Sequence, residues 1–342
     1  MLFQQIQKTK WINRKQNRLS IVLCCLLTCF CGSSFAEIVI GVVGKTKNDS
    51  FYEQSFKGCE EFAKDYKDVR CIYDGPQDYQ DIRSQTIIVN ELVEKGVDGL
   101  LISTTDSEFL VKGALSSIHI GKTPVVTFDS DLLPKHEKYR LAYVGTNNFN
   151  FGEALGNYVK QFSQSELNSI CLQSGHPTTP NLNERIAGIR YALSGQNDER
   201  LSGQNGWIEY ARCPLYSLGK RELALKQLEG ISNMKKPPIF LAVAGFAQFS
   251  PQYIERTVQF KKRIDSGELV IVSADTEDIQ LEALKQGLSV GNIGQKPFEM
   301  GRLGAELLYN YITQKQKPAK SHYYLDYHYC KQKNVESCTV NY

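Results

Sequence analysis

Short apolar runs alternate with amphipathic stretches along nearly all of the chain that follows residue 36. The first run, 37–44, reads EIVIGVVG, and a β-branched run of this length that ends in glycine is typical of a buried strand. Apolar residues at helical spacing follow it in 56–67, where Phe56, Cys59 and Phe62 share one face. The chain therefore begins its folded part with a strand and a helix.

The same reading continues to residue 311. Strands are expected at 37–44, 69–73, 99–103, 124–128, 141–144, 168–173, 208–213, 239–243, 269–274 and 289–293. Helices are expected at 56–67, 78–95, 107–119, 149–162, 183–193, 218–230, 251–266, 278–286 and 297–311. In the long helix 78–95, the residues predicted to point inward are Ile82, Ile87, Ile88, Leu92 and Val93.

This alternation predicts the fold class. Strands that are apolar at every position indicate parallel sheets covered by helices on both faces. Two successive runs of the pattern predict an α/β protein with two doubly wound lobes. In such sheets, ligands bind beyond the carboxyl ends of the strands.

The first 36 residues have the composition of an export signal. Basic residues without any acidic residue occupy 1–20, the apolar run 21–30 follows, and small residues stand at Ser34 and Ala36. The apolar run is about half of the ~20 residues that span a bilayer. We expect cleavage after Ala36 and a location in the periplasm. A lipid-modified Cys29 or Cys31 is the alternative.

The cysteines support an oxidising compartment. Six of the ten follow residue 36, and six cysteines allow 15 pairings. The segment layout favours the pairs Cys59–Cys71, Cys171–Cys213 and Cys330–Cys338. Free buried thiols are the alternative. A zinc site at Cys330 with His322 and His328 is less favoured, because no CxxC pair accompanies them.

Charge excludes one class of partner. The 40 Lys and Arg residues nearly cancel the 37 Asp and Glu residues, and their scattered arrangement is typical of a solvated exterior. No nucleic-acid partner is therefore expected.

Polar and aromatic residues gather where the predicted strands end. They fall in 45–52, 104–106, 129–131 and 176–185, and at Asp275 and Gln295. Carboxylates and amides can bond several hydroxyl groups, and an aromatic ring can stack on the apolar face of a sugar ring. This collection suits a neutral polyhydroxyl ligand.

Seven stretches together resemble a known family. They are 42–52, 98–106 (DGLLISTTD), 124–129 (PVVTFD), 143–156 (YVGTNNFNFGEALG), 183–188, 270–275 (VIVSAD) and 290–303 (VGNIGQKPFEMGRL). Their order and spacing resemble the class I periplasmic binding proteins of the ribose- and galactose-binding type, from Ile38 to about Lys320. The resemblance implies an N-terminal lobe of 37–145 and 296–320, a C-terminal lobe of 146–295 and a multi-strand hinge. We expect the tail, 321–342, to form a disulfide-closed hairpin on the C-terminal lobe.

The resemblance also implies roles for single residues. Phe51 and Tyr52 would sandwich the ligand ring, and Asp49 stands where the family usually has Asn. The remaining implied ligand contacts are Asp129 and Asp275 as hydroxyl acceptors, Arg185 as a donor and Gln295 at the hinge.

Five of these seven residues also have a structural alternative. Asp129 and Asp275 could cap helices, Phe51 and Tyr52 could belong to the core, and Arg185 could lie on the surface.

Two departures from the family pattern leave the ligand open. Ser130 replaces a common Arg, and 244–246 (AGF) replaces an Asn-Asp pair. A related sugar, a polyol or another metabolite therefore all remain open as ligands.

The sequence carries no signature of catalysis. GxSxG, HExxH, Walker and GxGxxG motifs are absent from the strand ends, so we predict a binding protein with no metal or cofactor. A secreted glycosidase using carboxylates across a cleft is the weakest alternative. We expect a monomer that delivers its ligand to the permease of an ABC importer; presentation of the ligand to a membrane sensor such as a histidine kinase is the alternative.

Overall fold

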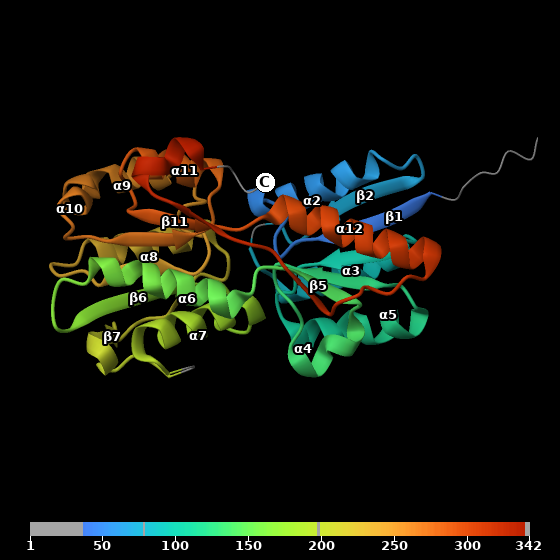
Figure 1. Cartoon of the computed structure of the whole chain (residues 1–342), viewed down its shortest axis with the longest axis horizontal. Helices are drawn as coiled ribbons and strands as arrows, with labels where there is room; N and C mark the ends of the chain where they lie inside the picture. The colour runs from blue at the N-terminus through green and yellow to red at the C-terminus, as the bar shows by residue number, and fades with distance from the viewer. Residues whose placement is uncertain (1–36, 78, 197–198, 339–342) are drawn as a thin grey trace, which may run out of the picture. The chain divides into compact units, whose positions relative to one another are not determined.

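The computed structural model describes residues 37–77, 79–196 and 199–338, so the predicted signal peptide lies outside the described residues. A first sheet has the strand order β12-β5-β4-β3-β1-β2, and all of its strands are parallel (Figure 1). Its strands are β1 (Ile38–Val43), β2 (Val69–Asp74), β3 (Gly99–Ile102), β4 (Val125–Phe128), β5 (Ala142–Gly145) and β12 (His322–Tyr324). Its helices are α2 (Ser50–Ala63), α3 (Ile82–Glu94), α4 (Ser107–Leu110), α5 (Ser116–Gly121) and α12 (Pro297–Gln314), with the π-helical turn η1 (Val111–Leu115) joining α4 to α5.

A second sheet has the order β13-β11-β10-β9-β6-β7, with β8 also paired to β6. Its strands are β6 (Asn168–Ser174), β7 (Trp207–Glu209), β8 (Leu215–Tyr216), β9 (Ile239–Ala242), β10 (Ile271–Ala274), β11 (Gly291–Gly294) and β13 (His328–Cys330). Its helices are α6 (Asn148–Val159), α7 (Pro180–Ser194), α8 (Arg221–Ser232), α9 (Tyr253–Thr257), α10 (Lys261–Asp265) and α11 (Asp278–Lys285). Only β13 is antiparallel to its neighbour among the described strands. The two parallel sheets confirm the predicted α/β class.

The strands are buried on both faces, as the uninterrupted apolar runs predicted. Ile40 and Val42 of β1 pack in a cluster with residues of α2 and α12, whereas Val43 packs with α3 on the opposite face. Alternate residues of one strand therefore enter two different cores.

Close helix packing depends on glycine in each half of the chain. A Cβ atom at Gly301 of α12 would lie 1.7 Å from the carbonyl oxygen of Ser55 in α2. A Cβ atom at Gly188 of α7 would lie 2.1 Å from the carbonyl oxygen of Phe149 in α6. Any larger residue would push these helix pairs apart.

Two predicted helices differ in detail. The helix expected at 56–67 begins at Ser50, because Asp49 caps it by accepting a hydrogen bond from Phe51 N. In α3, the prediction that Ile87 points inward was wrong, since its side chain is 56% exposed. Gln85 is buried instead, for it donates to the carbonyl oxygens of Gly44 and Ser103.

The tail also differs from the prediction, since its two strands do not form a hairpin. β12 pairs with β5 of the first sheet, and β13 pairs with β11 of the second. A strand at the edge of a sheet has unpaired backbone groups. The tail forms its backbone hydrogen bonds with two such strands, β5 and β11. The placement of the whole tail on the C-terminal lobe was therefore wrong; residues 339–342 lie outside the described residues.

Three disulfides join Cys59 to Cys71, Cys171 to Cys213 and Cys330 to Cys338, the pairing that the segment layout favoured. The third links β13 to the residue that follows the short helix η6 (Gln332–Ser337), beside Leu284 of α11. Within the described residues, no helix is both long and apolar enough to cross a membrane.

Candidate functional site

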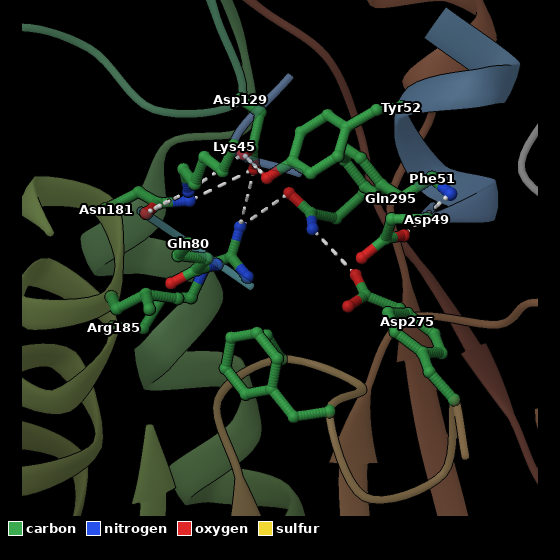
Figure 2. A pocket seen from close by; sticks show the side chains of 14 residues that line it. Lys45, Asp49, Phe51, Tyr52, Gln80, Asp129, Asn181, Arg185, Asp275 and Gln295 are labelled. Atoms are coloured by element: carbon green, nitrogen blue, oxygen red, sulfur yellow. Dashed lines mark hydrogen bonds and ion pairs between the residues drawn. The ribbon is translucent and has the colours of Figure 1, made fainter. Parts of the chain in front are cut away.

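Side chains from both halves of the chain meet around a pocket at the carboxyl ends of the parallel strands. Figure 2 shows the side chains that line it. The cavity among them has a volume of about 20 Å³, which is room for about one water molecule. It is lined by Lys45, Asp49, Phe51, Tyr52, Gln80, Asp129, Asn181, Leu182, Arg185, Ala244, Phe246, Phe249, Asp275 and Gln295. The structure thus brings together all seven residues that the sequence singled out as ligand contacts, at the edge where such sheets bind ligands.

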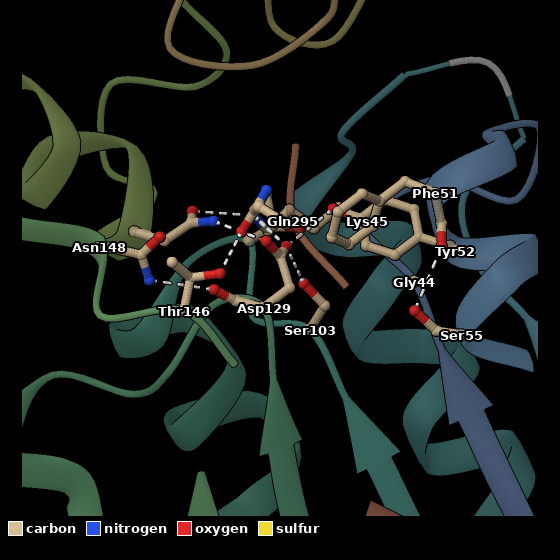
Figure 3. Close-up of polar contacts among 12 residues, drawn as sticks. Gly44, Lys45, Phe51, Tyr52, Ser55, Ser103, Asp129, Thr146, Asn148 and Gln295 are labelled. Carbon is tan, nitrogen blue, oxygen red and sulfur yellow. Dashed lines mark hydrogen bonds and ion pairs between the residues drawn. The ribbon is translucent and has the colours of Figure 1, made fainter. Parts of the chain in front are cut away.

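Asp129 is the centre of the polar network. It follows β4, is 3% exposed, and its Oδ2 lies 3.0 Å from Lys45 Nζ and accepts a hydrogen bond from Ser103 at 2.8 Å. Tyr52 also donates to Oδ2, at 3.2 Å, while Asn181 of α7 donates to Oδ1 at 3.0 Å. Figure 3 shows the contacts on the side of the first sheet. The carboxylate therefore joins residues of the two halves of the chain.

The cations decide the protonation state of this carboxyl. Burial alone would raise the pKa of Asp129, but the charges of Lys45 and Arg185, together with the hydrogen bonds from Ser103 and Lys45, hold it below its ordinary value. Burial lowers the pKa of Lys45, an effect that the charge of Asp129 partly offsets.

Arg185 of α7 is 1% exposed and spans the network. Its Nε donates to Asn148 Oδ1 at 2.8 Å, and one terminal nitrogen donates to the carbonyl oxygen of Val243 at 2.9 Å. The other donates to Gln295 Oε1 at 2.8 Å and lies 3.4 Å from Asp129. Each guanidinium nitrogen is thus bonded, which fixes the direction of the side chain.

Packing of α7 on α6 aims Arg185 into the pocket. A Cβ atom at Gly152 of α6 would lie 2.1 Å from the carbonyl oxygen of Arg185, so the backbones touch at this point. The guanidinium carbon lies 4.8 Å from the ring centre of Phe151, in a cation–π contact.

Asp275 and Gln295 complete the network from the second sheet. Gln295 Nε2 donates to Asp275 Oδ1 at 2.8 Å, and Gly245 N donates to Oδ2 at 3.0 Å. Thr146 donates to Gln295 Oε1 at 2.9 Å (Figure 3). Burial raises the pKa of Asp275, although Arg185 opposes the change. The departure at 244–246 thus supplies a main-chain donor to Asp275.

Phe51 and Tyr52 do not have the sandwich geometry that the resemblance implied. The ring centres of Phe51 and Tyr52 lie 5.4 Å apart and their planes meet at 74°, so no ligand ring fits between them. Both lie in the first turn of α2. Phe246 and Phe249 line the same pocket from the second half of the chain, so the pocket has aromatic side chains on both sides.

Asp49 has a dual position. It lines the pocket and caps α2, and burial raises its pKa from an ordinary value of 3.8 to about 6 despite the charge of Arg221. The alternative that Asp129 and Asp275 cap the helices after their strands was wrong, since Leu133 precedes η2 (Pro134–Tyr139) and Glu277 caps α11.

Three polar lining residues were not singled out from the sequence. Lys45 and Asn181 lie in the strand-end segments 45–52 and 176–185, although neither was named there as a ligand contact. Gln80 lies in a segment assigned to the helix 78–95, and no sequence signal placed it in the pocket.

Residues that could hold a metal have other partners. Asp131, Glu137 and His322 lie close together, but Arg140 stands among them, with one nitrogen 2.5 Å from Asp131 and 3.0 Å from His322. Cys330 is in a disulfide and offers no thiolate to zinc.

Comparison with known proteins agrees with this architecture. Residues 40–316 match the periplasmic binding protein domain. The chain belongs to this family.

Two curated relatives match parts of the chain. A D-ribose/D-allose-binding protein of Pseudomonas aeruginosa is 27% identical over 172 residues, 49% of this chain and 53% of the relative. The ribose import binding protein RbsB of Bacillus subtilis is 37% identical over 93 residues, 27% of this chain and 29% of the relative. The chain thus spans about half the length of the first relative and less of the second.

Solved structures match over a longer span. An ABC transporter solute-binding protein of Agrobacterium vitis with bound D-fucose has a TM-score of 0.75 at 21% identity, covering 87% of this chain and 97% of that one. Another, of Burkholderia graminis in complex with D-arabinose, has a TM-score of 0.72 at 22% identity, covering 89% and 98%. These similarities show a shared fold.

Proposed function

We propose that the chain is an exported binding protein that captures a small neutral polar ligand, a monosaccharide or a related metabolite, by closing its two lobes. One observation carries the proposal: Asp129 and Asp275, from opposite sheets, are joined across the pocket through Arg185 and Gln295. The curated relatives named for ribose and allose, and the neighbours with bound fucose and arabinose, support a sugar.

The charges of the pocket favour a neutral ligand. Lys45 and Arg185 both form ion pairs with Asp129 inside the pocket itself. Because the cations already have counter-charges, an added carboxylate or ammonium group would enter without a partner. Hydroxyl groups can bond to the same side chains as both donors and acceptors.

Closure is the expected mechanism of capture. Asn181 and Arg185 of α7 reach Asp129 of the other lobe directly, so these hydrogen bonds exist only when the lobes meet. A ligand that bonds to both sides of the pocket stabilises this closed state and shifts the population towards it.

Binding without catalysis fits the arrangement of the carboxyls. Asp129 is committed to two cations and Asp275 to Gln295 and Gly245, so neither side chain is placed as a free acid or base. We infer that the protein acts in the periplasm and delivers its ligand to the permease of an ABC importer.

The test is a binding measurement on the purified protein. D-ribose, D-allose, D-arabinose and D-fucose are added separately, and unfolding temperature and heat of binding are recorded. At a ligand concentration 100 times the dissociation constant, binding stabilises the folded state by about 2.7 kcal/mol. Native mass spectrometry of the protein as purified identifies other ligands.

The control variant is Asp275→Ala, which should lose the response. If no sugar or other small polar molecule binds, the proposal is wrong. Ligand-dependent ATP hydrolysis by the reconstituted permease supports delivery, whereas a response from a sensor kinase alone supports the signalling alternative.

A further inference from the structure

Gln80 is a buried side chain of the pocket that no part of the polar network satisfies. It is 4% exposed and lines the pocket beside the residues described above (Figure 2). Among the described residues, its carboxamide oxygen Oε1 has no hydrogen-bond partner. A buried amide oxygen without a partner destabilises the fold, so such groups are normally bonded. A donor on a bound ligand would remove this penalty.

The main chain of Gln80 is bonded to the other lobe. Its N–H donates to the carbonyl oxygen of Leu218 at 3.0 Å. Leu218 follows β8 and has a left-handed backbone, with φ of 56°, and its own N–H donates to Gly175 at the end of β6, at 3.1 Å. The acceptor is therefore fixed to the second sheet, while Gln80 belongs to the first lobe.

Two glycines of the second lobe, Gly175 and Gly219, leave the space that the side chain of Gln80 fills. A Cβ atom at Gly219 would lie 2.6 Å from Gln80 Cγ, and one at Gly175 would lie 2.5 Å from Gln80 Oε1. The side chain thus lies against the backbone of the second lobe when the lobes are closed.

The segment that carries Gln80 is held in place on its own lobe. The Tyr79 hydroxyl donates to Asp81 Oδ2 at 2.8 Å, and Asp81 caps α3 by accepting from Arg83 N and Ser84 N. Lys220 of the second lobe lies 4.6 Å from the centre of the Tyr79 ring. The contacts of Tyr79 and Asp81 thus orient the segment on its own lobe, and Lys220 adds a contact from the second lobe.

We infer that Gln80 is a specificity-determining residue whose carboxamide oxygen accepts a hydrogen bond from a ligand hydroxyl while its main-chain N–H bonds the closing lobe. This inference rests on the proposed function and adds a contact that the seven predicted residues did not include. Gln80 thereby links recognition of one hydroxyl to closure.

The experiment compares variants by calorimetry, with the sugar of the four named above that binds the wild type most tightly. Gln80→Leu removes the carboxamide but keeps the main-chain N–H, and should weaken binding roughly tenfold to hundredfold. Gln80→Glu keeps an acceptor oxygen and should bind more tightly than Gln80→Leu. The matched control is Gln77→Leu, the same change at an exposed position of the same loop, which should bind like the wild type.

Three results are distinguishable. Gln80→Leu that binds like the wild type, while Asp275→Ala does not bind, overturns the role of Gln80 and leaves the proposed function intact. A wild type that binds none of the sugars and carries no polar molecule overturns both. If Gln80→Leu does not fold, Gln80→Met, which is closer in shape and equally unable to accept a strong hydrogen bond, takes its place with the same expected loss.

Discussion

Asp129 and Asp275 occupy equivalent positions in the two sheets and have opposite electrostatic surroundings. Each follows a central strand with a left-handed backbone, φ being 56° and 70°, and each N–H donates to the next strand, to Val144 O at 3.2 Å and Ile293 O at 2.7 Å. Asp tolerates this conformation better than most residues. Yet Asp129 faces two cations and its pKa is lowered, whereas burial raises the pKa of Asp275.

This contrast predicts different effects of the same substitution on stability. Asp129→Asn leaves the charges of Lys45 and Arg185 buried without a counter-charge, and should lower the free energy of unfolding by roughly 3–5 kcal/mol. Asp275→Asn removes a carboxyl whose ionisation is unfavourable, and should change the free energy of unfolding by no more than about 1 kcal/mol. Asn suits a left-handed backbone, so strain is the same in both variants.

Urea unfolding at pH 7.5 without ligand measures both changes. Equal losses in the two variants would show that Lys45 and Arg185 do not depend on Asp129 for their charge balance. The response to sugar should fall in both variants, because each carboxylate lines the pocket.

Asp49 should make stability depend on pH. Its pKa is about 6 in the folded protein, above the ordinary value of 3.8, so the folded state binds this proton more tightly than the unfolded state. Stability from this group is therefore greatest at low pH and falls as the pH rises from about 4 to about 6. The difference between the two pKa values corresponds to a change of at most about 3 kcal/mol in the free energy of unfolding.

Asp49→Asn removes the titration and keeps a side-chain oxygen to cap α2. Unfolding free energies of both proteins at pH values from 4 to 8 should converge at low pH and diverge above pH 6, with the variant more stable. Glu184, whose pKa burial also raises to about 6, is present in both and cancels in the difference. If the two curves of unfolding free energy against pH ran parallel, Asp49 would not be the group with the raised pKa.

Local patterns predicted the strands and the main site residues because both depend on short-range information. An apolar run marks a strand buried on both faces, and the residue after it lies at the ligand-binding edge by geometry alone. Asp129, Asp275 and Gln295 were found in this way. The same rule applied to the end of β1 points to Lys45.

Contacts between distant segments could not be predicted. Gln80 enters the pocket because it contacts Leu218 and Gly219, which lie far away along the chain. The tail was misplaced for the same reason. Nothing in its sequence indicates that one of its strands pairs with β5 and the other with β11. Periodicity in 78–95 favoured Ile87 as a core residue. In the structure Gln85 is buried instead, because it bonds to backbone groups of segments that are distant in the sequence.

Gln85 should accordingly be important for stability. Its Nε2 donates to Gly44 O at 3.0 Å and Ser103 O at 2.8 Å, and its Oε1 accepts from Thr105 N at 3.0 Å. Gln85→Leu leaves three buried backbone groups without this partner, so a loss of roughly 3 kcal/mol or more in unfolding free energy is expected. Gln77→Leu is the control and should stay within about 0.5 kcal/mol. A similar small loss at Gln85 would mean that other groups replace its hydrogen bonds.

The disulfides should differ in their contribution according to the loop that each closes. Cys171 and Cys213 are 42 residues apart, whereas Cys59 and Cys71 are 12 apart. Chain entropy predicts stabilisation of about 4 kcal/mol for the longer loop and about 3 kcal/mol for the shorter one, because the longer loop restricts the unfolded chain more. Replacing each pair by two alanines and measuring urea unfolding under non-reducing conditions gives the two losses. A larger loss for the Cys59–Cys71 pair would show that packing around the sulfur atoms, and not loop length, dominates.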